Sequence, residues 1–157
     1  HLVAGEVAAF VEQLSYFLRN SVSYFDTKQS NTLEGFYHGF VLGMLSSVGI
    51  THYIRSNRES GLGRYDLLLI PKKEGSKALL LEFKQAGKEE ELESVAKLAL
   101  GQIQAQAYHT ELLQYPYVQE VVECGIAFSG KSVLSAYATY DLTGKQAGDV
   151  MLTNKYE

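Results

Sequence analysis

Cysteine and proline are scarce in this sequence, which contains one cysteine and two prolines. A single cysteine excludes an intrachain disulfide framework and a cysteine-rich zinc site. Cys124 lies within the apolar segment 121–128, so we expect a buried, inert thiol in a protein of a reducing compartment. The sequence also lacks a run of about 20 apolar residues and the pattern of a signal peptide, which predicts a soluble protein without a membrane partner.

Basic residues are fewer than acidic residues in this sequence. The chain has 14 Lys and Arg residues against 18 Asp and Glu residues, which gives a net charge of -4 at pH 7. Affinity for a phosphate backbone normally comes from clustered Lys and Arg side chains. The charge balance therefore argues against a tight, autonomous nucleic-acid binder.

The length of the chain bounds its organisation. With 157 residues and 46% hydrophobic content, it can form one α/β domain with a substantial core. It begins with His1 rather than Met, and residues 153–157 form a polar tail. We therefore expect a single domain over residues 1–157, with a core at about 31–140, that is a fragment of a longer protein.

The hydrophobic pattern predicts an alternation of helices and strands. Apolar residues at helical spacing indicate helices, and short β-branched or aromatic runs between turn residues indicate strands. In chain order, the pattern predicts helices at 2–18 and from Asn31 or Thr32 to Val48, strands at 50–58, 65–70 and 78–83, a helix from 88 to about 113, and strands at 121–128 and 133–140. We expect the glycine-containing segment 59–63 to be a turn.

The strands 65–70 and 78–83 flank a polar loop, which predicts an antiparallel hairpin. If Glu74 is its tip, Asp66 and Glu82 lie at equal distances from the tip along the chain and face each other. Directly opposed residues have Cβ atoms about 4.5 to 5.5 Å apart, and like charges there destabilise the sheet unless something compensates. A divalent cation bound between the two carboxylates would compensate for their repulsion.

Lys84 completes this cluster, because strand alternation places it on the same face as Glu82, with Phe83 on the other face. Two carboxylates and the Phe83 backbone carbonyl suit Mg²⁺ or Mn²⁺. The lysine could hold or deprotonate an attacking water and offset charge on phosphorus oxygens. The implied reaction is metal-assisted phosphodiester hydrolysis, and the competing interpretation is a surface ion pair among the three side chains.

The second predicted helix carries Glu34 and His38 four residues apart, hence on one face. Glu34 could reach the same cation directly or through water, and His38 could contact the substrate. A lone histidine there is more often a hydrogen-bonded core residue than a ligand. The pair resembles half of a zinc-protease helix, but the sequence lacks the second neighbouring histidine which that site requires.

Further polar residues could contact the substrate. Gln102 and Tyr108 lie on the helix predicted after Lys84 and could orient a water or a phosphate, although exposed helix surface is the alternative. Arg58 and Arg64 precede the first acidic residue and could bind phosphates, because arginine binds them through two nitrogens. An ordinary polar turn is the alternative for both arginines.

Most of the eleven tyrosines fall at positions that a helix or strand core would take. Tyr53, Tyr65 and Tyr108 are the three that we single out as candidates for stacking on nucleic-acid bases. Each of them lies close in the sequence to the polar residues named above.

The segment from Ser56 to Asp66, followed by the sequence Leu81 to Lys84, resembles the PD-(D/E)xK nuclease superfamily. More narrowly, the chain resembles a branch found behind AAA-type ATPase-like regions of bacterial proteins and in the nuclease domains of bacterial symbiont incompatibility toxins. The segments 34–38 and 102–108 also fit this branch. Tyr65 stands where the name-giving proline would be, and the acidic residue after it is in place.

The resemblance covers about residues 33–128 and implies a restriction-endonuclease-like α/β fold, in which helices flank a mixed central β-sheet of about four to five strands. It also implies that Asp66 and Glu82 are metal ligands, that Lys84 is catalytic, and that Glu34 and Gln102 are accessory site residues.

These observations favour a divalent-metal-dependent nuclease that uses Mg²⁺ or Mn²⁺ and acts on DNA, with RNA as a substrate that the same residues would also serve. We expect a toxin or effector module that acts in the cytoplasm of a bacterium or, if delivered, inside a host cell. The alternative is a catalytically inactive nuclease-like domain that binds a cognate protein partner or other domains of a longer chain, which the acidic net charge supports.

Overall fold

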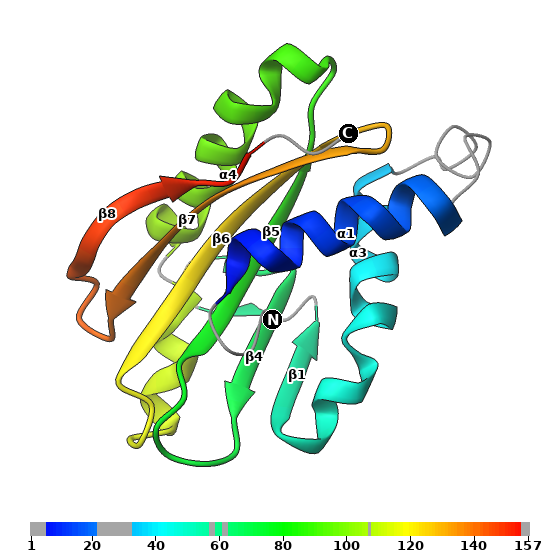
Figure 1. The fold of residues 1–157 in the computed structure, drawn as a ribbon. Coiled ribbons are helices and arrows are strands. Elements are labelled where there is room, and N and C mark those ends of the chain that lie inside the picture. Colours follow the sequence, from blue (N-terminus) through cyan, green and yellow to red (C-terminus); the bar gives the residue numbers. More distant parts are fainter. Residues whose placement is uncertain (1–5, 22–32, 57–58, 61–62, 107, 155–157) are drawn as a thin grey trace.

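A computed structural model describes residues 6–21, 33–56, 59–60, 63–106 and 108–154 (Figure 1). Six strands form one sheet in the order β1, β4, β5, β6, β7, β8. Within this sheet β5 and β6 run parallel, and the other neighbouring strands run antiparallel. The strands of this sheet are β1 (His52–Ser56), β4 (Leu67–Pro71), β5 (Ala78–Gln85), β6 (Glu120–Ser129), β7 (Ser132–Asp141) and β8 (Gln146–Leu152).

Helices cover both faces of the sheet (Figure 1). One face is covered by α1 (Val7–Ser21) and α3 (Leu33–Met44), and the opposite face by α4 (Leu92–Gln106). Because β5 and β6 are parallel neighbours, the chain must cross over between them, and α4 lies in that crossover. The structure thus confirms an α/β fold with a mixed central sheet flanked by helices.

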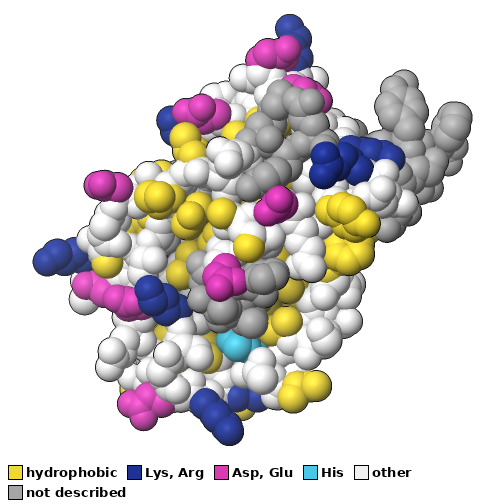
Figure 2. Space-filling view, in the orientation of Figure 1, with side chains coloured by type: hydrophobic (Ala, Val, Ile, Leu, Met, Phe, Trp, Pro, Cys, Tyr) yellow, Lys and Arg dark blue, Asp and Glu magenta, His cyan; other side chains and the backbone are white. Residues whose placement is uncertain are grey.

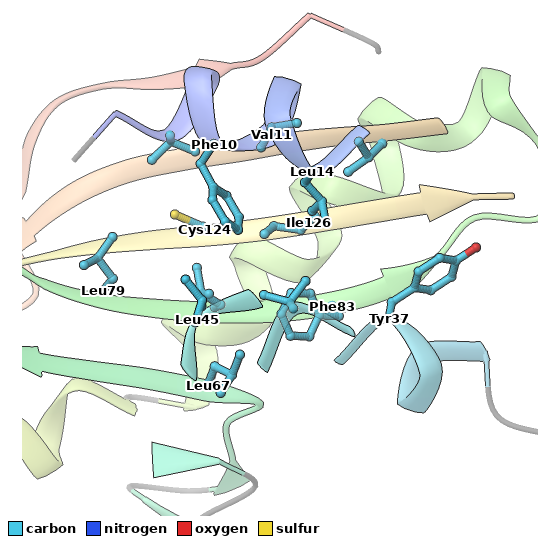
Figure 3. Close-up of a cluster of buried hydrophobic side chains, with 14 of the residues drawn as sticks. Phe10, Val11, Leu14, Tyr37, Leu45, Leu67, Leu79, Phe83, Cys124 and Ile126 are labelled. Atoms are coloured by element: carbon cyan, nitrogen blue, oxygen red, sulfur yellow. The ribbon is translucent and has the colours of Figure 1, made fainter. Parts of the chain in front are cut away.

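Three clusters of buried side chains form the core, and the two larger ones lie on opposite faces of the sheet; the third joins Leu92, Ala96 and Leu100 of α4 to β6 and β7. The α1/α3 cluster includes Phe10, Leu14, Tyr37, Leu81 and Phe83, and Figure 3 shows these helices directing their side chains onto the strands. The α4 cluster includes Leu68, Leu80, Ile103, Val121 and Tyr140. Alternate residues of β4 and β5 enter the two clusters, so both faces of these strands are buried. This explains why their sequences are continuous apolar runs.

The sheet has more strands than the four to five that we expected, because β8 was not predicted. All seven residues of β8 are exposed. A strand without a buried face has no alternation of apolar and polar residues, and hydrophobic periodicity therefore gives no signal for it. The segment expected to be a simple turn at 59–63 also contains two short strands, β2 (Glu59–Ser60) and β3 (Gly63–Arg64), which pair with each other.

The helix predicted from 88 to about 113 is divided in the structure. A 3-10 turn, η3 (Glu89–Glu91), precedes α4, and a second one, η4 (Tyr108–Gln114), follows it. In η4, Leu112 is buried in the α4 cluster, so the chain turns toward the sheet instead of continuing along the helix axis. Another 3-10 turn, η2 (Ser46–Ile50), follows α3. Among the described helices, none is long and apolar enough to cross a membrane.

Cys124 lies in β6 and is fully buried within the α1/α3 cluster. Burial raises the pKa of its thiol far above the ordinary value, because the charged thiolate is poorly solvated there. The expectation of a buried thiol is confirmed.

Glu123 is a buried carboxyl in the middle of the sheet. Its side chain is 2% exposed, beside Leu80 and Ala138 of the neighbouring strands. Within the described part of the chain, its Oε2 atom has no hydrogen-bond partner. Burial raises the pKa of this carboxyl from 4.5 to about 7, because a low-dielectric environment disfavours the charged form.

This raised pKa predicts a pH-dependent stability. The folded state binds the Glu123 proton more tightly than the unfolded chain, so the stabilising contribution is complete below pH 4.5 and is lost as the pH rises through 7. Relative to Glu123→Gln, which cannot ionise, the wild-type protein should lose about 2 kcal/mol of unfolding free energy between pH 5 and pH 8. Urea denaturation of both proteins at the two pH values measures this loss, and parallel pH profiles would contradict the prediction.

Candidate active site

Asp66 and Glu82 face each other where β4 and β5 meet. Leu67 pairs with Leu81, and Leu69 pairs with Leu79, across these antiparallel strands. Continuing this register by one residue places Asp66 opposite Glu82. The structure therefore confirms the register that the hairpin tip at Glu74 predicted.

Glu82 lies on the face of the sheet covered by α4. Leu80, two residues before Glu82, belongs to the α4 cluster, whereas Phe83 belongs to the α1/α3 cluster. Figure 3 shows the Phe83 ring among the side chains of the α1/α3 cluster. Because alternate residues of a strand point to opposite faces, Glu82 and Lys84 share the α4 face.

The Asp66 carboxylate is held against β5. Its Oδ2 atom accepts a hydrogen bond of 2.7 Å from the Phe83 backbone N–H. The N–H and C=O groups of a residue in an extended strand point toward the same neighbour, so the Phe83 carbonyl is also directed toward the Asp66 side of β5. This places one carboxylate and one backbone carbonyl at the start of β4, beside Glu82.

Gln102 of α4 holds the second carboxylate. Its Nε2 atom donates a hydrogen bond of 2.7 Å to Oε1 of Glu82, a residue only 5% exposed. A hydrogen bond from a neutral amide fixes the orientation of a buried carboxylate without neutralising its charge. Gln102 thus lies beside Glu82, and its observed contact is with this carboxylate.

A close approach of α4 to β6 makes this contact possible. Gly125 is the β6 residue paired with Glu82. A Cβ atom at Gly125 would lie 2.5 Å from the Leu100 backbone nitrogen and would also overlap the Ala96 carbonyl. Only glycine therefore allows α4 to lie this close to the strand. Nothing in the sequence analysis identified Gly125, since its role depends on a contact between distant segments.

Lys84 is half-buried near the end of β5. Within the described residues, no hydrogen bond or ion pair engages its ammonium group. The competing interpretation, a surface ion pair among Asp66, Glu82 and Lys84, predicts such a contact, and none is observed. An amine in this position remains available to a bound water or phosphate.

His38 lies in the core rather than beside the two carboxylates. It is 8% exposed, its Nε2 atom is 2.8 Å from the Ser56 hydroxyl, and its ring centroid is 5.7 Å from that of Phe83. Phe83 points away from the α4 face, so His38 contacts the opposite side of the sheet from Glu82. These contacts match a hydrogen-bonded core histidine, and the structure does not bring His38 to the acidic pair.

Four other predicted residues cannot be placed at the level of their side chains. Glu34, Arg64 and Tyr108 belong to α3, β3 and η4, and their side chains lie outside the described part of the structure. All of Arg58 lies outside it as well. Among the described residues, no group of three or more His, Cys, Asp or Glu side chains could hold a metal ion, so the described donors are the two carboxylates and the carbonyl.

The prediction that Tyr65 could stack on nucleic-acid bases is wrong. It is fully buried, and its hydroxyl donates a hydrogen bond of 2.7 Å to Oε2 of Glu111 in η4. A buried ring cannot stack on a base. Its role is structural, because it ties η4 to the residue that precedes Asp66.

The chain was compared with a family of known sequences, with curated proteins and with solved structures. The sequence model described as "PD-(D/E)XK nuclease superfamily" matches residues 32–137, which is more than half of the chain. Among solved structures, the chain is similar to the type IIG restriction endonuclease BpuSI, with a TM-score of 0.39 and 15% sequence identity over 76% of this chain and 13% of that chain. The chain thus corresponds to a small part of that endonuclease. No curated protein matches the sequence.

Proposed function

Because the chain belongs to the PD-(D/E)XK nuclease superfamily, we propose that it is a divalent-metal-dependent nuclease that hydrolyses phosphodiester bonds in DNA. The observation that carries this proposal is the position of the Asp66 carboxylate, which accepts the hydrogen bond of the Phe83 N–H next to Glu82, with Lys84 on the same face as Glu82. Two opposed carboxylates destabilise a sheet unless a cation compensates for their charge.

The donor set fits a hard divalent cation. Asp66, Glu82 and the Phe83 carbonyl supply oxygen ligands, which Mg²⁺ and Mn²⁺ prefer, and the described site offers no sulfur or imidazole ligand that would select a softer metal. Glu34 is our candidate for a further oxygen ligand. Such a cation, when bound, polarises a phosphoryl oxygen and lowers the pKa of a coordinated water.

The protein's own side chains then have separate roles. Lys84 holds the attacking water or accepts its proton, and its positive charge offsets the negative charge that develops on the phosphoryl oxygens. Gln102 keeps the Glu82 carboxylate in one orientation through their hydrogen bond. Arg58, Arg64 and Tyr108 are our candidates for binding the substrate backbone or bases. His38 packs against Phe83 on the other face of the sheet.

DNA is the substrate that we favour, and a toxin or effector module of a bacterial protein is the role that we favour. The same carboxylates and lysine would also cut RNA, because a metal ion and its carboxylate ligands do not distinguish the two sugars unless another group recognises the 2′-hydroxyl. Cleavage assays on both polymers therefore form part of the test.

A second candidate function is a catalytically inactive nuclease-like domain that binds a protein partner. The net charge of -4 favours it, because phosphate backbones attract clustered cations. On the face seen in Figure 2, the described Lys and Arg side chains are interspersed with Asp and Glu side chains and form no continuous basic area. A partner with mixed charges would suit this face better than a duplex would.

Cleavage of single-stranded DNA, duplex DNA and RNA tests the proposal, with Mg²⁺, with Mn²⁺ and with EDTA. We expect wild-type cleavage that depends on the metal and a loss of at least about a hundredfold in Glu82→Gln, which removes the charge and keeps the shape. Circular dichroism of both proteins serves as the control for folding. If the wild-type protein cuts none of the substrates with either metal, the nuclease proposal fails and the partner-binding function takes its place.

A further inference from the structure

A group of aromatic and basic side chains lies along the outer strand of the sheet, on the same face as the candidate active site. We call this group the tyrosine edge, and it consists of Tyr53, Arg55, Lys72 and Tyr115. β1 is the first strand of the sheet and has a paired strand on one side. Tyr53 is one of the tyrosines predicted to stack on bases, but no sequence pattern places Tyr115 beside it, because Tyr115 lies far away in the sequence.

Two cations flank the exposed ring of Tyr53. The Arg55 guanidinium carbon is 5.3 Å from the ring centroid, and the Lys72 ammonium nitrogen is 5.2 Å from it. The ring is 38% exposed, so a ligand in solution can reach it. The Tyr115 ring lies 6.1 Å away at a tilt of 37°. The result is a small surface with one exposed aromatic ring, a second ring that is partly buried, and two positive charges.

The register of β1 and β4 places the tyrosine edge on the α4 face. Tyr53 pairs with Ile70, and Arg55 pairs with Leu68. Ile70 and Leu68 both belong to the α4 cluster, so Tyr53 and Arg55 share the face of Glu82 and Lys84. Asp66 lies four residues before Ile70, which is roughly 13 Å along an extended strand. The tyrosine edge therefore lies within a few nucleotides of the acidic pair.

The positive charges of the tyrosine edge are not neutralised within the described chain. No described carboxylate forms an ion pair with Arg55 or Lys72, and the buried Nε atom of Arg55 has no hydrogen-bond partner there. The Lys72 ammonium donates one hydrogen bond, to the Gly49 carbonyl. In a chain of net charge -4, two adjacent cations without acidic partners are complementary to an anionic ligand.

We propose that the tyrosine edge binds an unpaired strand of nucleic acid and guides it to the acidic pair. Bases stack on Tyr53 and Tyr115, and phosphates contact Arg55 and Lys72. An unpaired strand is the ligand that fits, because the bases of a duplex are already stacked on one another and present no free face to a tyrosine. The inference rests on the proposed nuclease function and names its substrate as a single strand or an unpaired end.

Fluorescence anisotropy with a labelled single-stranded DNA oligonucleotide, and with the same oligonucleotide in a duplex, tests the inference. Binding is measured in the full Glu82→Gln chain in EDTA, so that no cleavage occurs. In this background, Tyr53→Ala should weaken single-strand binding by about tenfold and duplex binding by less than about twofold. Tyr53→Phe keeps the ring and should bind as its parent does.

A second pair of variants tests the charge. Lys72→Gln should weaken single-strand binding and reduce the slope of log affinity against log salt by about 0.7. Lys145→Gln replaces an exposed lysine in the turn between β7 and β8 and serves as the matched control, with the slope unchanged. An unchanged slope in Lys72→Gln would contradict a phosphate contact at this position.

The outcomes separate this inference from the proposed function. If the wild-type protein cuts DNA but Tyr53→Ala binds and cuts single strands as well as wild type does, the tyrosine edge is not the substrate path. If Tyr53→Ala weakened binding to single strands and to duplexes equally, the inference would also be overturned. If single-strand binding depends on Tyr53 while the wild-type protein cuts nothing, the binding surface stands and the nuclease function fails.

Discussion

Replacing Lys84 with methionine should reduce single-turnover cleavage by about a thousandfold while the protein stays folded. Methionine keeps most of the volume of the half-buried side chain and removes its charge. A group that moves a proton and stabilises charge in the transition state typically contributes effects of this size. Because no described residue depends on the Lys84 ammonium for a hydrogen bond or an ion pair, the thermal unfolding temperature should change little.

Two controls sharpen this prediction. Lys145→Met alters an exposed lysine between β7 and β8 and should cleave like the wild type. Calorimetric titration with Mn²⁺ should detect binding to Lys84→Met at least as tight as in the wild type, because removing a nearby positive charge does not weaken a cation site. If Lys84→Met cleaves normally, the lysine is not catalytic; if it unfolds, the lysine is structural.

Replacing Leu80 with alanine should lower the free energy of unfolding by about 2 to 5 kcal/mol. Leu80 is fully buried in β5 and belongs to the α4 cluster between the sheet and the helix. The variant loses the apolar surface of the side chain and leaves a cavity beneath α4. Because Glu82 lies two residues further along the same strand, cleavage should also fall as the contact between Gln102 and Glu82 loosens.

Urea denaturation followed by circular dichroism measures this loss. Leu98→Ala is the matched control, since Leu98 lies on α4 with 64% of its side chain exposed and alanine is a better helix former. We expect this control to change the stability by less than about 0.5 kcal/mol. Equal losses in the two variants would mean that the α4 cluster does not stabilise the fold in the way described.

The sequence was sufficient to predict the central hairpin and its acidic pair. Asp66 directly precedes β4, and Glu82 lies in β5, the next strand, so the midpoint of the short loop between the two strands determines the register. The same period of two residues separates Lys84 and Glu82 from Phe83. The hairpin register and the alternation of side chains along a strand are both determined by residues close together in the sequence.

Other features depend on segments that are distant in the sequence. The close contact of Gly125 with α4, the packing of His38 against Phe83 and the approach of Tyr115 to Tyr53 each join separate elements. No spacing rule relates their positions. β8 is a different case, because its fully exposed residues lack the alternation that would identify a strand.

We expect the acidic pair and the helix that encloses it to form at different stages of folding. The hairpin of β4 and β5 brings Asp66 and Glu82 together through a short loop, whereas the contact between Gln102 and Glu82 requires α4 to cross over before β6 can pair with β5. Short loops close at lower entropic cost, and contacts between distant segments form more slowly. The carboxylates are therefore exposed to solvent until α4 docks. A divalent cation present during that interval would screen their repulsion and should accelerate the pairing of β4 with β5.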